Sequence, residues 1–218
     1  MLKIGHRGAK GYVAENTLAS FQKAIELGVD IIELDVHLSL DDKIMVIHDE
    51  TVDRTTTKKG FVNQYKASEL QKLGIPLLED VINLAFKQVI LNIELKDHLV
   101  YNVVYLIDKY VFEKNWLYEH FQISSFDWKL LEFISTMNRP IALGVLTEDS
   151  LDNAIAFAKK INAFSINPYF KLLNDENVLA MHQNGFKIYP WTVNSEEDIT
   201  FVKSLNVDGI ISDFPDRI

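Results

Sequence analysis

Short β-rich segments alternate with amphipathic helical segments along the whole chain, and this alternation limits the folds that the chain can adopt. Nine segments have the composition of strands: 3–6, 30–36, 43–49, 89–96, 121–126, 141–146, 163–167, 187–193 and 208–212. Helical spacing of apolar residues predicts helices at 16–27, 99–112, 127–136, 150–160, 174–184 and 195–205. Repeated strand–helix units predict a parallel sheet, either closed into a barrel or open with helices on both faces.

The number of strands is one more than a barrel of eight strand–helix units needs. Between Val36 and Ile44 the sequence has no room for a crossover helix, and Asp41 and Asp42 indicate a tight return. One of these two neighbouring segments is therefore expected to be a hairpin arm or an extra strand. The chain has no internal repeat or linker, so we expect a single domain over residues 1–218.

Composition narrows the function. The formal charge of −9 argues against a general nucleic-acid binder, although local cations could still bind an anionic small molecule. The chain has no cysteine, which fits a reducing compartment. No signal-like segment opens it, and no apolar run reaches the roughly 18 residues of a membrane span. We therefore expect a cytoplasmic protein without stable membrane insertion, and its oligomeric state stays open.

Carboxylates fall on one face of two predicted strands. Side chains alternate along a strand, so Glu33 and Asp35 lie opposite the apolar face of 30–38, and Glu94 and Lys96 lie opposite that of 89–96. Strands of a parallel sheet are normally apolar on both faces, and a buried carboxylate costs several kcal/mol unless it is paired or binds a cation. The alternative is that these are surface strands of an antiparallel sheet, with the carboxylates facing water. The alternation of strands with helices argues against it.

The spacing of these carboxylates favours a metal site. Glu33 and Asp35 lie about 6.6 Å apart at Cα, since each residue of a strand rises by half of that distance, so their oxygens can converge on one cation. Glu94 can add a third carboxylate. Ligands that are all oxygen favour Mg²⁺ or Ca²⁺ over zinc. In a barrel the functional groups gather at the carboxyl ends of the strands, which is where these residues fall.

Histidines and cations fall at the same predicted strand ends. His6 and His48 are suited to acid–base chemistry near neutral pH, and Arg7 and Lys96 to binding a phosphate. In the opening motif HRG (6–8), Gly5 and Gly8 would let the chain turn sharply so that the residues between them face a ligand.

The chain resembles the glycerophosphodiester phosphodiesterase family in an ordered set of short motifs over essentially its whole length. The motifs are HRG (6–8), ENT (15–17), ELDV (33–36), VIHD (46–49), DRTT (53–56), IPLLEDV (75–81), IELK (93–96), SSF (124–126), WTVN (191–194) and DGIISDFPD (208–216). Each motif is weak alone, but the ordered set is highly specific. Many members of the family have a longer segment where this chain has residues 50–75, and that segment forms a small cap. We therefore expect a minimal cap here and a more open entrance to the site.

The resemblance implies a TIM (β/α)8 barrel that hydrolyses glycerophosphodiesters to sn-glycerol 3-phosphate and an alcohol. The implied site residues are His6 and His48 as the acid–base pair, Glu33, Asp35 and Glu94 around one divalent cation, and Arg7 and Lys96 on the phosphate. We favour His6 as the base and His48 as the acid. By analogy with phospholipases of this fold, the attacking group is the neighbouring glycerol hydroxyl, giving a cyclic phosphate; a metal-activated water is the alternative.

Other residues are weaker candidates. Trp191 forms either an apolar wall for glycerol or part of the core. Glu15 and Asn16 either touch the site or, for Asn16, cap the next helix. Asp49 either orients His48 or caps a turn. The remaining candidates carry less weight still: Asp213 as a support for His6, the loop Arg54–Thr56 as a cover over the site, and His37, His98, His120 and His182, which are expected mainly to pack or face solvent.

Two other functions compete with this one. A lysophospholipase D-type enzyme would use apolar surface on the loops 11–14 and 167–170. A non-catalytic barrel that binds a phosphate ligand would be expected to lack one of the histidines or carboxylates, and all of them are present.

Overall fold

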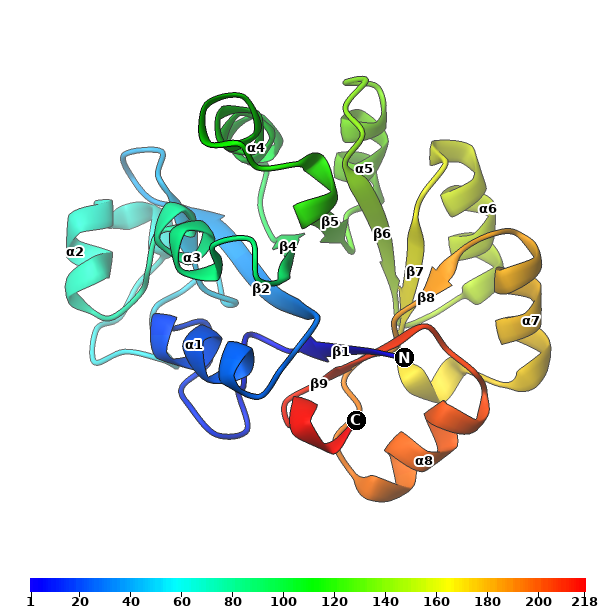
Figure 1. Ribbon diagram of the computed structural model, residues 1–218. Helices are drawn as coiled ribbons and strands as arrows, with labels where there is room; N and C mark the ends of the chain where they lie inside the picture. The colour runs from blue at the N-terminus through cyan, green and yellow to red at the C-terminus, as the bar shows by residue number, and fades with distance from the viewer.

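Eight parallel strands surround a common axis, with helices outside them (Figure 1). The computed structural model describes residues 1–218. The strands are β1 (Leu2–Gly5), β2 (Ile31–Leu38), β4 (Ile90–Leu95), β5 (Phe121–Ser125), β6 (Ala142–Thr147), β7 (Ser165–Pro168), β8 (Lys187–Ile188) and β9 (Gly209–Ser212). They pair in the order β8-β7-β6-β5-β4-β2-β1-β9.

The two ends of this sheet meet. Backbone hydrogen bonds run from Asp208 N to Ile188 O (3.2 Å) and from Val193 N to Ile211 O (3.0 Å), which joins the segment around β8 to β9. The predicted barrel is therefore confirmed and the open sheet is wrong. The segment predicted as a strand at 187–193 is regular only at its start, although its later residues still bond to β9.

The ninth strand is a hairpin arm. β3 (Ile44–Val46) pairs antiparallel with β2, with Val36 opposite Val46 and Leu38 opposite Ile44. The tight return expected after Val36 is thus confirmed, and it accounts for the strand in excess of eight.

Helices fill the connections between strands. They are α1 (Leu18–Glu26), α2 (Ala67–Lys72), α3 (Leu78–Ala85), α4 (Val100–Lys114), α5 (Trp128–Ser135), α6 (Leu151–Ile161), α7 (Asp175–Gln183) and α8 (Glu196–Ser204). Four 3-10 turns lie at Val62–Gln64, Tyr118–His120, Phe170–Leu172 and Pro215–Arg217. The side chains of Thr17, Asp127, Ser150, Asn174 and Ser195 cap helices by accepting bonds from first-turn backbone N–H groups. No helix has both the length and the apolar character needed to cross a bilayer.

Two helices were not predicted. α3 connects the β2–β3 hairpin to β4, and its buried residues Leu78, Val81, Ile82 and Ala85 follow helical spacing. That pattern is visible in the sequence, but the eight residues follow a proline closely and were interpreted only as a motif. α2 is a six-residue helix, too short for periodicity to mark it.

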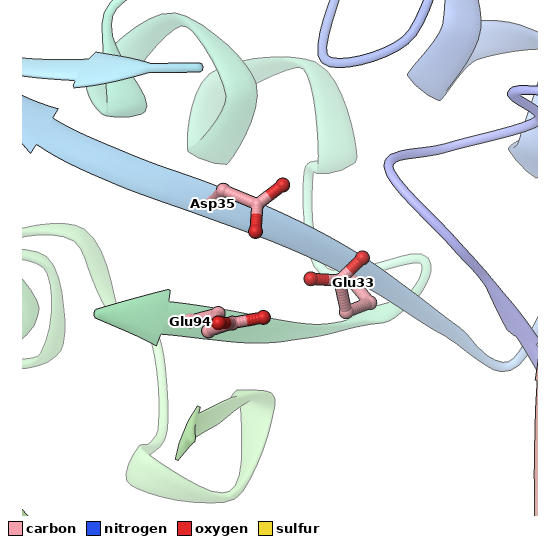
Figure 2. Close-up of side chains that lie close together, drawn as sticks. All are labelled: Glu33, Asp35 and Glu94. Atoms are coloured by element: carbon pink, nitrogen blue, oxygen red, sulfur yellow. The ribbon is translucent and has the colours of Figure 1, made fainter. Parts of the chain in front are cut away.

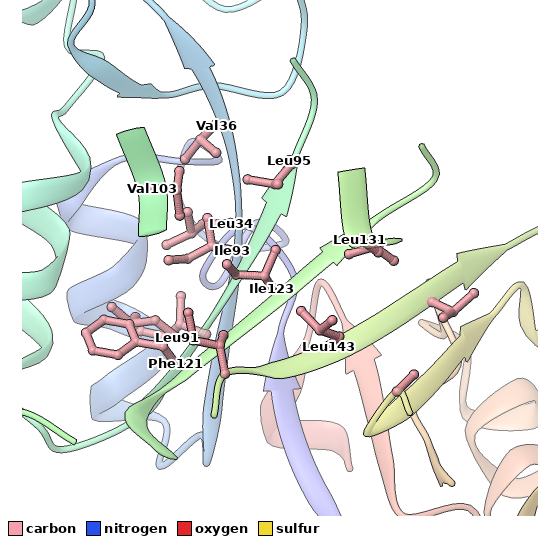
Figure 3. Packing of buried hydrophobic residues seen from close by; sticks show 14 of the residues in the cluster. Leu34, Val36, Leu91, Ile93, Leu95, Val103, Phe121, Ile123, Leu131 and Leu143 are labelled. Carbon is pink, nitrogen blue, oxygen red and sulfur yellow. The ribbon is translucent and has the colours of Figure 1, made fainter. Parts of the chain in front are cut away.

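The barrel has an apolar outer layer and a divided interior. Side chains such as Leu34, Ile93 and Ile123 point outward and pack under helical residues including Val103 and Leu131 (Figure 3). Inside the barrel, a smaller cluster of Ile4, Ile31, Tyr189 and Ile211 packs together. Polar residues occupy further interior positions: Glu33, Asp35, Asn92, Glu94, Gln122, Ser124, Ser165 and Asn167 are all buried. The interior therefore carries a buried polar layer as well as an apolar plug.

Residues 50–75 pack around a core of their own. Val52, Val62, Leu70 and Ile75 form a separate cluster with Met45 of β3. A bridge between Thr51 and Phe61 and the helix α2 complete the segment. This small core attaches the insertion to the hairpin, beside the carboxyl end of β2.

Candidate active site

Three carboxylates converge inside the barrel on two adjacent strands. The register of β2 with β4 places Asp35 beside Glu94 and Glu33 beside Asn92. One oxygen from each of Glu33, Asp35 and Glu94 lies within 4.8 Å of the other two (Figure 2). The cluster predicted from strand alternation is thus assembled, and strand pairing alone accounts for its geometry.

Burial and the neighbouring charges shift the pKa values of these three carboxylates strongly. Burial, followed by the charges of Asp35 and Glu94, raises the pKa of Glu33 well above its ordinary value. Burial and Asp35 likewise raise the pKa of Glu94 to about 7. Burial acts in the same direction on Asp35, but Lys96 and Arg7 outweigh it and lower that pKa to about 2. A divalent cation among the three would relieve the repulsion that disfavours their ionised forms.

The HRG turn delivers Arg7 to this cluster. Gly8 has φ +87°, and a Cβ atom there would lie 2.5 Å from Ser20 Oγ, so this turn requires glycine. Arg7 itself is left-handed at φ 50°. Its backbone N–H donates to Glu33 Oε2 at 2.9 Å, and its guanidinium lies 3.3 Å from Asp35 Oδ2. The predicted sharp turn is confirmed.

Lys96 follows β4 by one residue and reaches Asp35 from that strand, whereas Arg7 reaches it from the HRG turn. Its Nζ is paired with Glu94 and lies 3.2 Å from Asp35 Oδ1. Lys96 and Arg7 together place two cations beside a buried anionic cluster. Such an arrangement can bind a phosphate through Arg7 and Lys96 while the carboxylates hold a metal cation next to it.

His6 is held by a carboxylate from the far end of the chain. Its Nδ1 donates to Asp213 Oδ1 at 2.6 Å, and Asn194 donates to the other oxygen of Asp213 at 2.8 Å. Burial lowers the pKa of His6 below its ordinary value, although Asp213 opposes this shift. With Nδ1 engaged, Nε2 is the nitrogen left to exchange a proton. The support expected of Asp213 is therefore present as a direct contact.

His48 is held in the same way by its neighbour. Its Nδ1 donates to Asp49 Oδ1 at 2.7 Å, so the orienting contact is the one the structure shows. Burial lowers the pKa of His48, and Asp35 and Asp49 oppose the shift. His48 is expected at the end of the segment 43–49, and the structure places it just after β3, the hairpin arm. β3 runs antiparallel and brings His48 back down beside β2, where His37 Nε2 donates to His48 O at 3.0 Å.

One cavity contains most of the predicted residues. A cavity of about 100 Å³ is lined by His6, Arg7, Glu33, His48, Glu94, Lys96 and Trp191, with Asn92, Ser124 and Phe126. Trp191 is half-buried; its indole N–H donates to Asn167 O at 2.8 Å, and its ring meets Phe126 edge-on. Trp191 thus forms a wall of the cavity while it is also anchored to the barrel. The histidines His98, His120 and His182 do not line it.

Four buried polar atoms around the cluster have no hydrogen-bond partner: Arg7 Nε, Asn16 Oδ1, Asp35 Oδ1 and Ser124 Oγ. Those of Arg7 and Asp35 each have an opposite charge nearby, at 3.3 and 3.2 Å. Asn16 donates its amide N–H to Asp35 Oδ2 at 2.8 Å, and Thr17 is the residue that caps α1, so the capping interpretation of Asn16 is wrong. Buried polar atoms without partners are costly, and a cation or phosphate would satisfy them. The all-oxygen donors present therefore fit a hard divalent cation.

An arginine of the insertion connects these parts. Arg54 donates to Asp49 (2.7 and 3.0 Å) and to Glu15 (2.8 and 3.0 Å). Glu15 also accepts from Arg7 at 2.7 Å, so a continuous chain of ion pairs runs from Arg7 to His48. The sequence indicates Arg54 either as part of a loop that covers the site or as a plain turn residue. Its partners lie 39 and 5 residues away, and only the fold reveals the longer contact.

Replacing Arg54 by Gln is expected to lower kcat for a reaction at this site by about 10-fold or more, because it displaces His48 and small displacements of a reacting group lower rates steeply. The loss should be smaller for Arg54→Lys, which keeps the charge but not the paired N–H groups. Arg139→Gln is the matched control, since Arg139 makes a similar pair with Asp108 away from the site. Equal kcat values for all three variants and the unaltered protein would show that Arg54 does not position His48.

Comparisons with known proteins agree with this geometry. A family model described as the glycerophosphoryl diester phosphodiesterase family matches residues 6–217. A glycerophosphodiester phosphodiesterase of Caldanaerobacter subterraneus is 37% identical, and the match covers 100% of this chain and 96% of that one. The crystal structure of such an enzyme from Thermotoga maritima has a TM-score of 0.86 at 29% identity and covers 99% and 96% of the two chains. A phosphodiesterase of Oleispira antarctica, solved in complex with the product sn-glycerol-3-phosphate, has a TM-score of 0.87 at 25% identity, covering 99% and 94%.

Proposed function

The chain belongs to the glycerophosphoryl diester phosphodiesterase family, and from this premise we propose that it hydrolyses glycerophosphodiesters to sn-glycerol 3-phosphate and an alcohol by histidine acid–base catalysis beside a divalent cation. The observation that carries the proposal is the pair of His–Asp contacts whose histidines line one cavity with Glu33 and Glu94. Each histidine presents Nε2, and a phosphate-binding Arg and Lys share the same cavity. The relative solved with sn-glycerol-3-phosphate supports the choice of product.

In this mechanism the chain's own residues bind the diester and move two protons. Arg7 and Lys96 bind the non-bridging phosphate oxygens and offset the charge that builds on them. His6 Nε2 takes the proton of the attacking hydroxyl as its oxygen bonds to phosphorus. The bond from phosphorus to the leaving alcohol breaks, and His48 Nε2 gives that oxygen its proton. Asp213 and Asp49 hold the rings in the required tautomers.

We propose the neighbouring glycerol hydroxyl as the attacking group, which gives a cyclic phosphate that water then opens with the histidine roles reversed. A water attacking the diester directly is the alternative. Trapping or chemical detection of a cyclic glycerol phosphate during the first turnovers separates the two routes.

The proposed cation would be held by Glu33, Asp35 and Glu94. When bound, it supplies Lewis-acid stabilisation of the anionic phosphate. Carboxylate oxygens accept both Mg²⁺ and Ca²⁺, and we propose one of these two. Because the three carboxylates are buried, the same ion would also stabilise the fold.

Removing the cation with a chelator is expected to abolish release of sn-glycerol 3-phosphate from glycerophosphocholine and glycerophosphoethanolamine. Adding back Mg²⁺, Ca²⁺ or Mn²⁺ singly identifies the ion that restores it. At a cation concentration of 100 times Kd, binding stabilises the fold by about 2.7 kcal/mol. For a chain of this size that raises Tm by about 5–10 °C. Unchanged activity and unchanged Tm after the chelator would refute the proposed cation site.

The lysophospholipase D alternative receives less support from the geometry. Of the two loops expected to provide apolar surface, residues 11–14 line a groove beside the site, but Phe170 in the other loop is buried in the core. The cavity of about 100 Å³ on the side of Arg7 and Lys96 suits a short polyol better than an acyl chain. We propose in addition that residues 1–218 form one domain, with residues 50–75 as a short insertion, and that the protein is cytoplasmic.

A further inference from the structure

We propose that a groove between residues 10–17 and the insertion binds the leaving alcohol of the diester, and that it favours an uncharged or anionic polyol over a cationic amino alcohol. This inference rests on the proposed function and adds the class of leaving group. The groove has a volume of about 560 Å³, several times that of the cavity holding the carboxylates. It lies beside the candidate site, on the side of α1 and the insertion.

His48 joins the two spaces. Among the residues that line the carboxylate cavity, His48 alone also lines the groove. In an in-line displacement at phosphorus, the attacking and leaving oxygens lie on opposite sides of the phosphorus atom. The group that protonates the leaving oxygen must therefore lie on the leaving-group side. A diester whose phosphate sits at Arg7 and Lys96 then extends past His48 into the groove. His6 lines the carboxylate cavity but not the groove, as the group that serves the attacking oxygen should.

The walls of the groove are part apolar and part hydroxyl-bearing. The apolar lining residues are Val13, Ala14, Val46, Ile47, Leu73 and Ile75, and the hydroxyl groups come from Tyr12, Thr17, Thr55 and Thr56. Thr55 is exposed, so its hydroxyl is accessible to a ligand. A lining that offers both apolar carbon atoms and hydroxyl groups complements a polyol, which itself carries CH and OH groups along its chain.

The charges in the groove disfavour an ammonium group. Glu15 is its acidic residue, but the Glu15 carboxylate already accepts from Arg7 and Arg54. Its pKa is about 2 because these two arginines outweigh the effect of burial. Lys10 also lines the groove and adds a further positive charge. Tyr12 is the one aromatic lining residue, and its hydroxyl donates to Asp216, so the groove has no aromatic cage for a quaternary ammonium.

The test compares leaving groups on otherwise identical diesters: glycerophosphomethanol, glycerophosphoglycerol and glycerophosphocholine. Thr55→Trp fills the groove and is expected to lower the ratio of kcat/KM for glycerophosphoglycerol to that for glycerophosphomethanol by about 10-fold, which is the usual scale of discrimination by pocket shape. Thr57→Trp is the matched control, since Thr57 is exposed in the same loop but does not line the groove. It should keep the ratio of the unaltered protein.

Reversing the charge of Lys10 provides a second, independent test of the proposal. The unaltered protein should prefer glycerophosphoglycerol to glycerophosphocholine, and Lys10→Glu should shift that preference toward choline by about 10-fold. Lys58→Glu, an exposed lysine outside the groove, should leave it unchanged. Active Thr55→Trp and Lys10→Glu proteins with unaltered ratios would overturn the leaving-group assignment alone. A folded, metal-loaded protein that cleaves none of the three diesters would refute the proposed function, and the assignment with it.

Discussion

Replacing Asp35 by Asn is expected to lower kcat/KM for the best glycerophosphodiester substrate by at least about 10³-fold, a loss of about 4 kcal/mol of transition-state stabilisation. Asp35 is 1% exposed, and it is the member of the carboxylate cluster that contacts both Arg7 and Lys96. It faces Arg7 at 3.3 Å and Lys96 at 3.2 Å, and it accepts from Asn16 at 2.8 Å. The neutral amide removes one of the three carboxylates proposed to hold the cation, and it removes the negative charge beside Arg7 and Lys96.

The same substitution should change stability much less than activity when no cation is bound. Burial and the charge of Asp35 together raise the pKa of Glu94 to about 7, and Asp35 contributes in the same direction for Glu33. Without that charge, Glu33 and Glu94 ionise more readily and can compensate Arg7 and Lys96 in its place. The cost of leaving two buried cations unpaired is thereby reduced.

The measurement is Tm with and without the cation, alongside steady-state kinetics. Asp35→Asn should lose most of the cation-induced rise in Tm. Asp208→Asn is the matched control, because Asp208 also contacts two basic side chains, Lys187 at 2.8 Å and His182 at 2.9 Å, but just before β9 and away from the cluster. It should lower Tm and keep the response to the cation. If the cation raised the Tm of Asp35→Asn as much as that of the unaltered protein, the cation would bind elsewhere.

Much of this fold follows from local sequence patterns. The alternation of apolar residues in 30–38 and 89–96 identifies which face of each strand carries Glu33, Asp35 and Glu94, because side-chain direction depends only on the strand period. Parallel pairing then aligns Asp35 with Glu94, since β2 and β4 are neighbours in the sheet. The carboxylate cluster was therefore predictable before any tertiary contact was known.

Contacts between distant segments were less predictable. The bond from Arg54 to Glu15 depends on how the insertion lies over the first loop, which no period in the sequence encodes. The sequence left open whether Asn16 touches the site or caps α1. The next residue, Thr17, caps the helix, and Asn16 reaches Asp35. The tight return after Val36 was predictable from Asp41 and Asp42, but the contact of His48 with His37 that it brings about was not.

Replacing His48 by Ala is expected to lower kcat by about 10³-fold for a diester with an alkyl leaving group. An alkoxide is a poor leaving group and needs a proton, which the proposed mechanism takes from His48. A diester that releases p-nitrophenol needs far less assistance, because the phenolate is already stable. His48→Ala should therefore retain much more of the unaltered protein's activity on the nitrophenyl diester than on the alkyl diester.

His6→Ala is the contrasting variant, since loss of the base should slow both diesters to a similar extent. The pH dependence adds a separate readout. Burial lowers the pKa of His48, so its protonated form is present below that pKa and is lost as the pH rises through it. The alkaline fall in rate with the alkyl diester should begin below the ordinary histidine value of about 6.5, and it should be absent in His48→Ala. If His6→Ala instead shows the selective rescue by the nitrophenyl diester, the acid and base are exchanged, and the attacking group enters from the side of the groove.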